Sequence, residues 1–319
     1  MIILMKDSFD REIDYLRISV TDLCNLRCTY CMPKDGVHKI SHDQIISVER
    51  IEEIVKEAVK LGIKKVRLTG GEPLVRKGIT EICWRISRIS GIEELCLTTN
   101  GILLKSLAKD LKNSGVDRLN ISLDTLNKDK YLRITRGGNI DDVFSGIKEA
   151  IRVGFNNIKI NVVLIGGFND DEINDFAKFA EDNDLSVRFI ELMPIGEGTS
   201  MKKESFISND IILNTVPNLV KVSDDGVSSL YKFKSGKGSI GLISPLSHSF
   251  CKSCSRIRLT SDGKIKPCLH SDIEIDLNGL SGEELSIAIK KAILLKPKEH
   301  HLNETMKSSS KRGMFEIGG

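Results

Sequence analysis

Six of the eight cysteines in this chain of 319 residues fall into two compact groups, and thiolates are strong ligands for soft metals. Cys24, Cys28 and Cys31 have three and then two residues between them and directly follow an expected strand, so one loop can direct three thiolates toward one cluster. Structural zinc usually takes four protein ligands, whereas a four-iron, four-sulfur cluster on three cysteines leaves one iron free for a small molecule. The other two, Cys83 and Cys96, stand among apolar neighbours and are expected to be small core residues.

The second group consists of Cys251, Cys254 and Cys268, with two and then thirteen residues between them. It also lacks a fourth cysteine. A zinc site completed by His248 or His270 fits this spacing, and so do separate zinc sites built from all six cysteines. By itself, the second group favours neither zinc nor an iron–sulfur cluster.

The composition narrows the setting for this chemistry. Lys and Arg number 47 and Asp and Glu 44, and the net charge of +3 is too small for a protein that tracks nucleic acid over its whole surface. Hydrophobic residues make up 40% of the chain, enough for a packed core, but no apolar run approaches the ~20 residues of a membrane span. A cytoplasmic protein without a nucleic-acid or membrane partner is expected. In that reducing compartment, cysteines serve as metal ligands rather than disulfides.

The elements that must position these groups alternate between strand and helix over the first two thirds of the chain. Six strands are predicted, at Tyr15–Val20, Lys65–Thr69, Glu94–Thr99, Asp117–Leu123, Asn157–Leu164 and Ser186–Leu192. A helical segment follows each of the first five, and such βα repeats produce a parallel sheet. The clearest helix is predicted from about Asp43 to Leu61, with Ser41 and Gln44 as its capping box and Gly62 at its end.

Side chains in these strands alternate between two faces. One face is apolar and is expected to pack against the helices; it carries Leu16, Ile18, Val20, Val66, Leu68, Leu119, Ile121, Leu123, Ile158, Ile160 and Val162. The other face is polar and carries Arg17, Ser19, Arg67, Thr69, Asn120, Ser122, Asp124, Lys159 and Asn161. A doubly wound sheet would be apolar on both faces. The pattern therefore predicts a curled sheet around a polar cavity, and the inward cations Arg17, Arg67 and Lys159 indicate an anionic ligand.

Several runs of sequence resemble the radical S-adenosylmethionine (SAM) enzymes. The run from Leu16 to Asn25 and on to Cys31-Met32-Pro33 carries this resemblance. Four further segments, 67–73, 120–124, 189–194 and 251–268, resemble the GTP 3',8-cyclase family, which acts first in molybdenum cofactor biosynthesis. Arg256-Ile257-Arg258 and the final Gly318-Gly319 narrow the resemblance to this family.

The resemblance implies an α/β fold with two parts. Residues 1–193 would form an incomplete (βα)6 barrel, similar to a TIM barrel, with its site at the C-terminal ends of the strands. Residues 194–319 would form a smaller region with a second iron–sulfur cluster and a tail whose glycines, Gly318 and Gly319, reach the active site and assist there.

The resemblance also implies two [4Fe–4S] clusters and SAM as cofactors. The first cluster would be held by Cys24, Cys28 and Cys31, and SAM would bind to its open iron beside Tyr30, Gly71, Ser122 and Met193. The second would be held by Cys251, Cys254 and Cys268, with GTP on its open iron. Residues implied for GTP are Arg17, Arg67, Thr98, Lys159, Arg256 and Arg258, with Lys65 and Arg188 as weaker candidates.

The implied activity is that of a lyase which uses radical SAM chemistry to convert GTP to (8S)-3',8-cyclo-7,8-dihydroguanosine 5'-triphosphate. An electron donor and a downstream cyclic pyranopterin monophosphate synthase are implied as partners, and a homodimer is allowed. Two alternatives stay open: another radical SAM enzyme with an auxiliary cluster, such as a peptide-modifying maturase, and a zinc-stabilised binding module. A maturase does not explain the Arg256/Arg258 pair or the glycine end.

Overall fold

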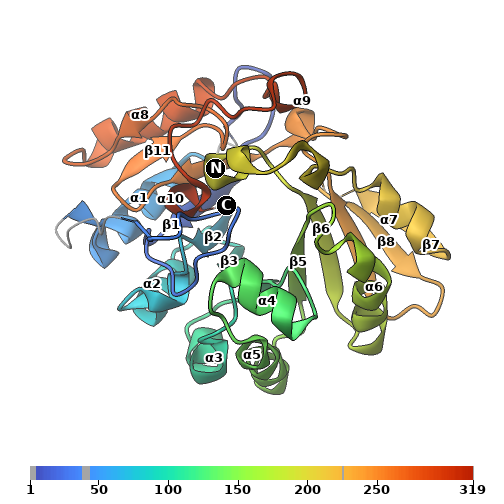
Figure 1. The fold of residues 1–319 in the computed structure, drawn as a ribbon. Coiled ribbons are helices and arrows are strands. Elements are labelled where there is room, and N and C mark those ends of the chain that lie inside the picture. The colour runs from blue at the N-terminus through green and yellow to red at the C-terminus, as the bar shows by residue number, and fades with distance from the viewer. Residues whose placement is uncertain (1–4, 38–43, 225, 319) are drawn as a thin grey trace.

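The computed structural model describes residues 5–37, 44–224 and 226–318, and within them twelve strands form one curved sheet (Figure 1). Its middle consists of six parallel strands: β1 (Tyr15–Ser19), β2 (Lys65–Thr69), β3 (Glu94–Thr99), β4 (Arg118–Ser122), β5 (Ile158–Leu164) and β6 (Ser186–Glu191). They lie side by side in chain order. The predicted incomplete barrel of six βα units is confirmed.

Strands from the last third of the chain extend the sheet at both of its edges. At one edge, β9 (Ser239–Ile243) pairs in parallel with β6 and continues into β8 (Ser229–Phe233) and β7 (Leu219–Asp224). At the other, β10 (Arg256–Leu259) pairs in parallel with β1 and continues into β11 (Lys264–Lys266) and β12 (Ile275–Asp276). The last third of the chain therefore completes the sheet on two sides.

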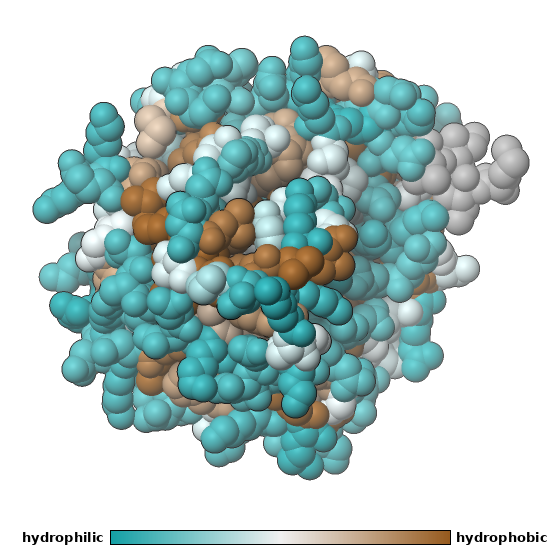
Figure 2. Space-filling view, turned by 90° about the vertical axis from the view of Figure 1, so that its right-hand side faces the viewer, coloured by the Kyte–Doolittle hydropathy of each residue, from teal (hydrophilic) through white to brown (hydrophobic). Residues whose placement is uncertain are grey.

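Helices cover the outer, convex side of the sheet (Figure 1). They are α1 (Val48–Lys60), α2 (Ile79–Ser87), α3 (Leu104–Asn113), α5 (Ile140–Arg152), α6 (Ile173–Asp182) and α8 (Gly282–Leu294). Shorter helices are α4 (Lys128–Thr135), α7 (Asp210–Thr215), α9 (Leu302–Thr305) and α10 (Met314–Ile317). The surface on the side of α6 and α7 is mostly hydrophilic (Figure 2). Among the described helices, none combines the length and apolar character that a membrane crossing requires.

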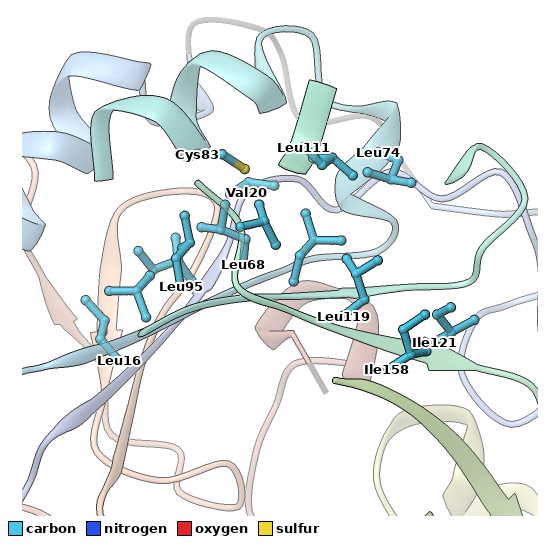
Figure 3. Close-up of a cluster of buried hydrophobic side chains, with 14 of the residues drawn as sticks. Leu16, Val20, Leu68, Leu74, Cys83, Leu95, Leu111, Leu119, Ile121 and Ile158 are labelled. Atoms are coloured by element: carbon cyan, nitrogen blue, oxygen red, sulfur yellow. The ribbon is translucent and has the colours of Figure 1, made fainter. Parts of the chain in front are cut away.

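The core lies between the sheet and these helices (Figure 3). Leu16, Leu68, Leu119 and Ile121 are fully buried, as the alternation of the strands predicts, and Cys83 of α2 packs against the same layer. Full burial of one such aliphatic side chain contributes about 1.5–3 kcal/mol to the stability of the fold. Burial of this layer is therefore the main contribution that holds the strands in place. The apolar face and the core position of Cys83 are confirmed.

The first helix begins later than predicted. α1 starts at Val48, and its N-cap is Ser47, whose hydroxyl accepts a hydrogen bond of 3.1 Å from the backbone N–H of Arg50. The predicted cap Ser41 and start Asp43 lie outside the described residues. Ser47 has the extended backbone that an N-cap requires, and the buried helical face begins with Ile51, so the later serine is the effective cap.

Candidate active site

The concave side of the sheet encloses a cavity of about 350 Å³. Arg17 of β1 is paired in register with Arg67 of β2 on one side and with Arg258 of β10 on the other. Side chains at matched positions of neighbouring strands point to the same face, so three guanidinium groups meet at one wall. The structure also brings to this cavity the other positions expected for GTP, namely Thr98, Lys159 and Arg256, together with Lys65 and Arg188.

The cations in this cavity repel one another. Burial lowers the pKa of Arg17 well below its usual value, and the nearby charges of Arg258, Arg256 and Arg67 lower it further. Burial and Arg256 lower the pKa of Arg258 to about 10. A concave, partly enclosed cavity with this many positive charges is stabilised by a ligand that carries several negative charges. Phosphate groups suit arginine as a partner.

Tyr15, two residues before Arg17 on β1, contacts two arginines of this cavity. Its hydroxyl accepts a hydrogen bond of 2.5 Å from Nε of Arg67. The guanidinium groups of Arg67 and Arg256 each lie 5.8 Å from the centre of its ring. One aromatic side chain thus holds two arginines from different strands in fixed positions.

The second cysteine group lines the same cavity. Cys251 lies in a short 3₁₀ turn, Cys254 lies two residues before the start of β10, and Cys268 follows β11. Burial raises the pKa of Cys251, but hydrogen bonds from His300 and a serine outweigh this effect and bring it to about 7. Burial likewise raises the pKa of Cys254, while the charges of Lys296 and Arg256 bring it below its usual value. Cys251 and Cys254 are therefore more readily deprotonated than ordinary thiols, and the thiolate is the form that binds metal.

The two histidines considered as zinc ligands lie in different places. His248 is exposed, and its Nε2 is 3.0 Å from a carboxylate oxygen of Asp210. His270 is buried beside the second cysteine group, with Nδ1 3.2 Å from the hydroxyl of Ser308 and its ring 4.9 Å from that of His300. In the described part of the chain, no three Cys, His, Asp or Glu side chains are grouped to hold a single metal ion.

The first cysteine group lies in the loop after β1. Backbone N–H groups of Cys31 and Met32 both donate to the carbonyl of Cys28 at 3.0 Å, which folds the loop into a tight turn. Burial, with Cys24 and Asp124 as nearby charges, raises the pKa of Cys31 to about 12. Burial also raises the pKa of Cys28, and the charges of Asp124, Cys31 and Cys24 raise it further, so bare thiolates in this loop would repel one another. A positively charged cluster would remove that repulsion. The donor set of each group therefore fits an iron–sulfur cluster with one iron free of protein ligands.

Comparison with known proteins agrees with this geometry. Residues 18–180 match the Radical SAM superfamily, and residues 185–302 match Molybdenum Cofactor Synthesis C. A protein named GTP 3',8-cyclase from Alkaliphilus oremlandii (strain OhILAs) is 52% identical over 320 residues, covering 99% of this chain and 100% of the relative. Its namesake from Alkaliphilus metalliredigens (strain QYMF) is 50% identical over the same shares of both chains. This chain belongs to the GTP 3',8-cyclase family.

Solved structures share the fold at low sequence identity. SuiB of Streptococcus suis superposes with a TM-score of 0.60 at 16% identity, over 92% of this chain and 69% of that protein. The protein anSMEcpe with bound AdoMet gives 0.58 at 16% identity, over 89% and 78%. As a member of the GTP 3',8-cyclase family, the chain is a radical SAM enzyme that binds SAM and carries two [4Fe–4S] clusters. Membership decides against the maturase and zinc-module alternatives.

Four positions are expected for SAM, and two of them, Tyr30 and Gly71, lie in or against the first cysteine loop. A Cβ atom at Gly71 would lie 2.5 Å from the carbonyl oxygen of Leu23 and 2.6 Å from that of Asp22, so the cysteine loop itself requires glycine there. The hydroxyl of Tyr30 donates to the carboxylate of Asp124 at 2.7 Å. The last two positions are Ser122, at the end of β4, and Met193, which follows β6 and lines the cation cavity.

The C-terminal tail enters the mouth of the barrel, where the C-terminus is marked in Figure 1. Arg258 donates hydrogen bonds to the carbonyl oxygens of Ile317 at 3.0 Å and Gly318 at 2.5 Å. Gly318 has φ +64°, and a Cβ atom there would overlap Oγ1 of Thr69. The last residue, Gly319, lies outside the described residues. The tail thus lies between the end of β2 and the cation cavity of this family member.

Several cavity residues were not predicted. Tyr15 and Arg118 line it, and both share the inward face with residues that were predicted, so the alternation of β1 and β4 could have identified them. Cys96 is fully buried, as expected of a small core residue, but it lies on the inward face, where its sulfur accepts a 3.2 Å contact from Arg118. Lys296 and His300 come from an irregular segment without any periodic signal.

Proposed function

We propose that this chain catalyses the reaction for which its family is named, the cyclisation of GTP to (8S)-3',8-cyclo-7,8-dihydroguanosine 5'-triphosphate, the first step of molybdenum cofactor biosynthesis. One observation carries the proposal: the second cysteine group and the arginine wall line the same cavity. A nucleoside triphosphate has a base that can bind iron and a tail of negative charge. A single GTP molecule can therefore use both features of this cavity.

In this proposal, different cations of the cavity bind different parts of GTP. Arg17, Arg67 and Lys159 would bind phosphate oxygens from the barrel strands, since the side chains of all three line this cavity. Arg256 and Arg258 lie two and four residues after Cys254, so they would bind the part of the nucleotide nearest the second cluster. Thr98 adds a hydroxyl, which accepts a 3.1 Å hydrogen bond from Arg67.

SAM on the first cluster supplies, after reduction, the radical that starts the reaction. We assign the first cluster to Cys24, Cys28 and Cys31 and the second to Cys251, Cys254 and Cys268. Tyr30, Gly71, Ser122 and Met193 would hold SAM. Met193 already lines the GTP cavity, so the two ligands would meet there. The chain's own contribution is to fix the distance between the two reactants and to exclude water.

We also propose the partners, the cellular location and the division of the chain that the sequence predicts. An electron donor supplies the reducing equivalents, a cyclic pyranopterin monophosphate synthase takes the product, and both act in the cytoplasm; a homodimer is compatible with this scheme. Residues 1–193 would be the radical SAM barrel and residues 194–319 the region of the second cluster. The two family matches, which end at residue 180 and begin at residue 185, support a division near this point.

The proposal is tested with cluster-reconstituted protein, GTP, SAM and a strong reductant under anaerobic conditions. We expect 5'-deoxyadenosine to form only when GTP is present, together with the cyclised triphosphate. The Cys251→Ala variant should lack the iron of one cluster and should not form the cyclised product. The Cys83→Ala variant, which changes a core cysteine, should keep its full iron content and form the product. Release of 5'-deoxyadenosine without GTP would reject GTP as the substrate.

A further inference from the structure

Arg312 ties the C-terminal tail to the far edge of the sheet. Its guanidinium donates to both carboxylate oxygens of Glu274, at 2.7 and 2.8 Å, and to Asp262 at 2.8 Å. Asp262 lies in the turn between β10 and β11, and Glu274 directly precedes β12. The arginine thus joins the tail to two turns of the strands that carry the second cysteine group.

Each of the two carboxylates also accepts a hydrogen bond from a residue other than Arg312. Glu274 also accepts a 3.0 Å hydrogen bond from Nζ of Lys266, whose side chain is fully buried. Asp262 accepts one of 2.5 Å from the hydroxyl of Thr260. The side chain of Arg312 is itself only 14% exposed. A bidentate, half-buried network of this kind is far more rigid than an ion pair on the surface.

A short, well-ordered connection leads from this network to the active site. The backbone N–H of Gly313 donates to the carboxylate of Glu316 at 2.7 Å, which closes the first turn of α10. Ile317 is buried, and its carbonyl accepts a hydrogen bond from Arg258. Gly318 follows at once against Thr69. Because only five residues separate Arg312 from Gly318, the position of the arginine fixes how far the glycine enters the barrel.

We propose that Arg312 is a positioning residue for cyclisation: through Asp262 and Glu274 it holds the terminal glycine between Thr69 and Arg258. The placement of the tail rests on the contacts above. Its effect on turnover rests on the proposed function.

The test compares Arg312→Gln with wild type in the cluster-loaded enzyme. Hydrogen exchange of the backbone at residues 313–318 should rise by about tenfold or more, and kcat for GTP should fall by a similar factor, with iron and sulfide content unchanged. Arg152→Gln, which removes a 2.6 Å ion pair with Glu149 on the exposed face of α5, should change neither quantity. Unchanged exchange, or unchanged kcat, in the Arg312 variant would overturn the proposal.

A second variant, Asp262→Asn, controls for misfolding and tests whether Asp262 acts on the tail through Arg312. Asp262→Asn leaves the pair with Glu274 intact and should give a smaller rise in exchange. Added to Arg312→Gln, it should raise exchange no further, because Asp262 acts on the tail through Arg312. Additive effects would contradict this route. If wild type itself fails to convert GTP, the proposed function fails, while the exchange comparison still decides how the tail is held.

Discussion

At the scale of single residues, Arg17 shows how a binding cavity stores unfavourable charge. It lies between Arg67 and Arg258 in register, and their charges, with burial, lower its pKa well below the usual value. A ligand that neutralises such a cluster gains binding energy, but the ligand-free fold is less stable because of it.

Arg17→Gln should therefore raise the free energy of unfolding of the ligand-free protein by about 0.5–2 kcal/mol. It should also weaken GTP binding by about tenfold or more, since a charge-assisted hydrogen bond is lost. Thermal unfolding and calorimetry measure the two effects. Arg133→Gln, at an exposed position of α4, should show neither. Loss of stability with unchanged GTP affinity would contradict this view of the cavity.

Gly318 offers a second prediction at this scale, because its neighbours leave no space for a side chain. Gly318→Ala should lower turnover by about tenfold or more, since the displaced tail would no longer reach its place beside Thr69. Cluster content should stay the same. Gly279→Ala is the matched control: Gly279 has φ +78° and no atom within 4 Å of an added Cβ, so it has the same backbone cost without the clash. Equal activity of both variants would show that the contact is dispensable.

At the scale of elements, the network that joins the tail to β11 and β12 predicts a dependence on pH. Burial raises the pKa values of Asp262 and Glu274, but hydrogen bonds from Arg312 outweigh it and leave both below their usual values of 3.8 and 4.5. Lys264 also faces Asp262, and Lys266 faces Glu274. Carboxylates with lowered pKa values stabilise the fold above about pH 4.5, and this stabilisation is lost as the pH falls through the lowered values.

Arg312→Gln should thus cost about 1–2 kcal/mol of unfolding free energy at pH 7, and its difference from wild type should shrink toward pH 3. Urea titrations of the cluster-free chain at several pH values measure this difference. The exposed pair of Arg152 should contribute much less at any pH, so Arg152→Gln provides the comparison. A difference that grows as the pH falls would contradict the assigned network.

At the scale of the whole molecule, the last third of the chain protects both edges of the barrel. β9 pairs with β6, and β10 pairs with β1. Unpaired edge strands attract other chains. A fragment of residues 1–193 should therefore aggregate, whereas residues 1–311, which keep all twelve described strands, should remain monodisperse. Size-exclusion chromatography with light scattering distinguishes the two. A monodisperse, cooperatively unfolding 1–193 fragment would show that the barrel folds alone.

Alternation along each strand made much of this site predictable. Arg17, Arg67 and Lys159 were assigned to a cavity because polar and apolar residues alternate around them, and local geometry alone decides which face a strand residue takes. The cysteine spacing likewise marked two groups of three ligands. The same alternation, applied more widely, would have placed Tyr15 and Cys96 on the inward face.

Contacts between distant segments could not be obtained in this way. Nothing local indicates that β10 lies beside β1, yet that pairing puts Arg258 next to Arg17. The same is true of the tail, where Arg312 meets two carboxylates that are 38 and 50 residues away in sequence. Periodicity reports on neighbours within a turn or a strand, whereas these contacts depend on which strands pair once the core has formed. Long-range packing alone brings the second cysteine group, the arginines and the tail to one cavity.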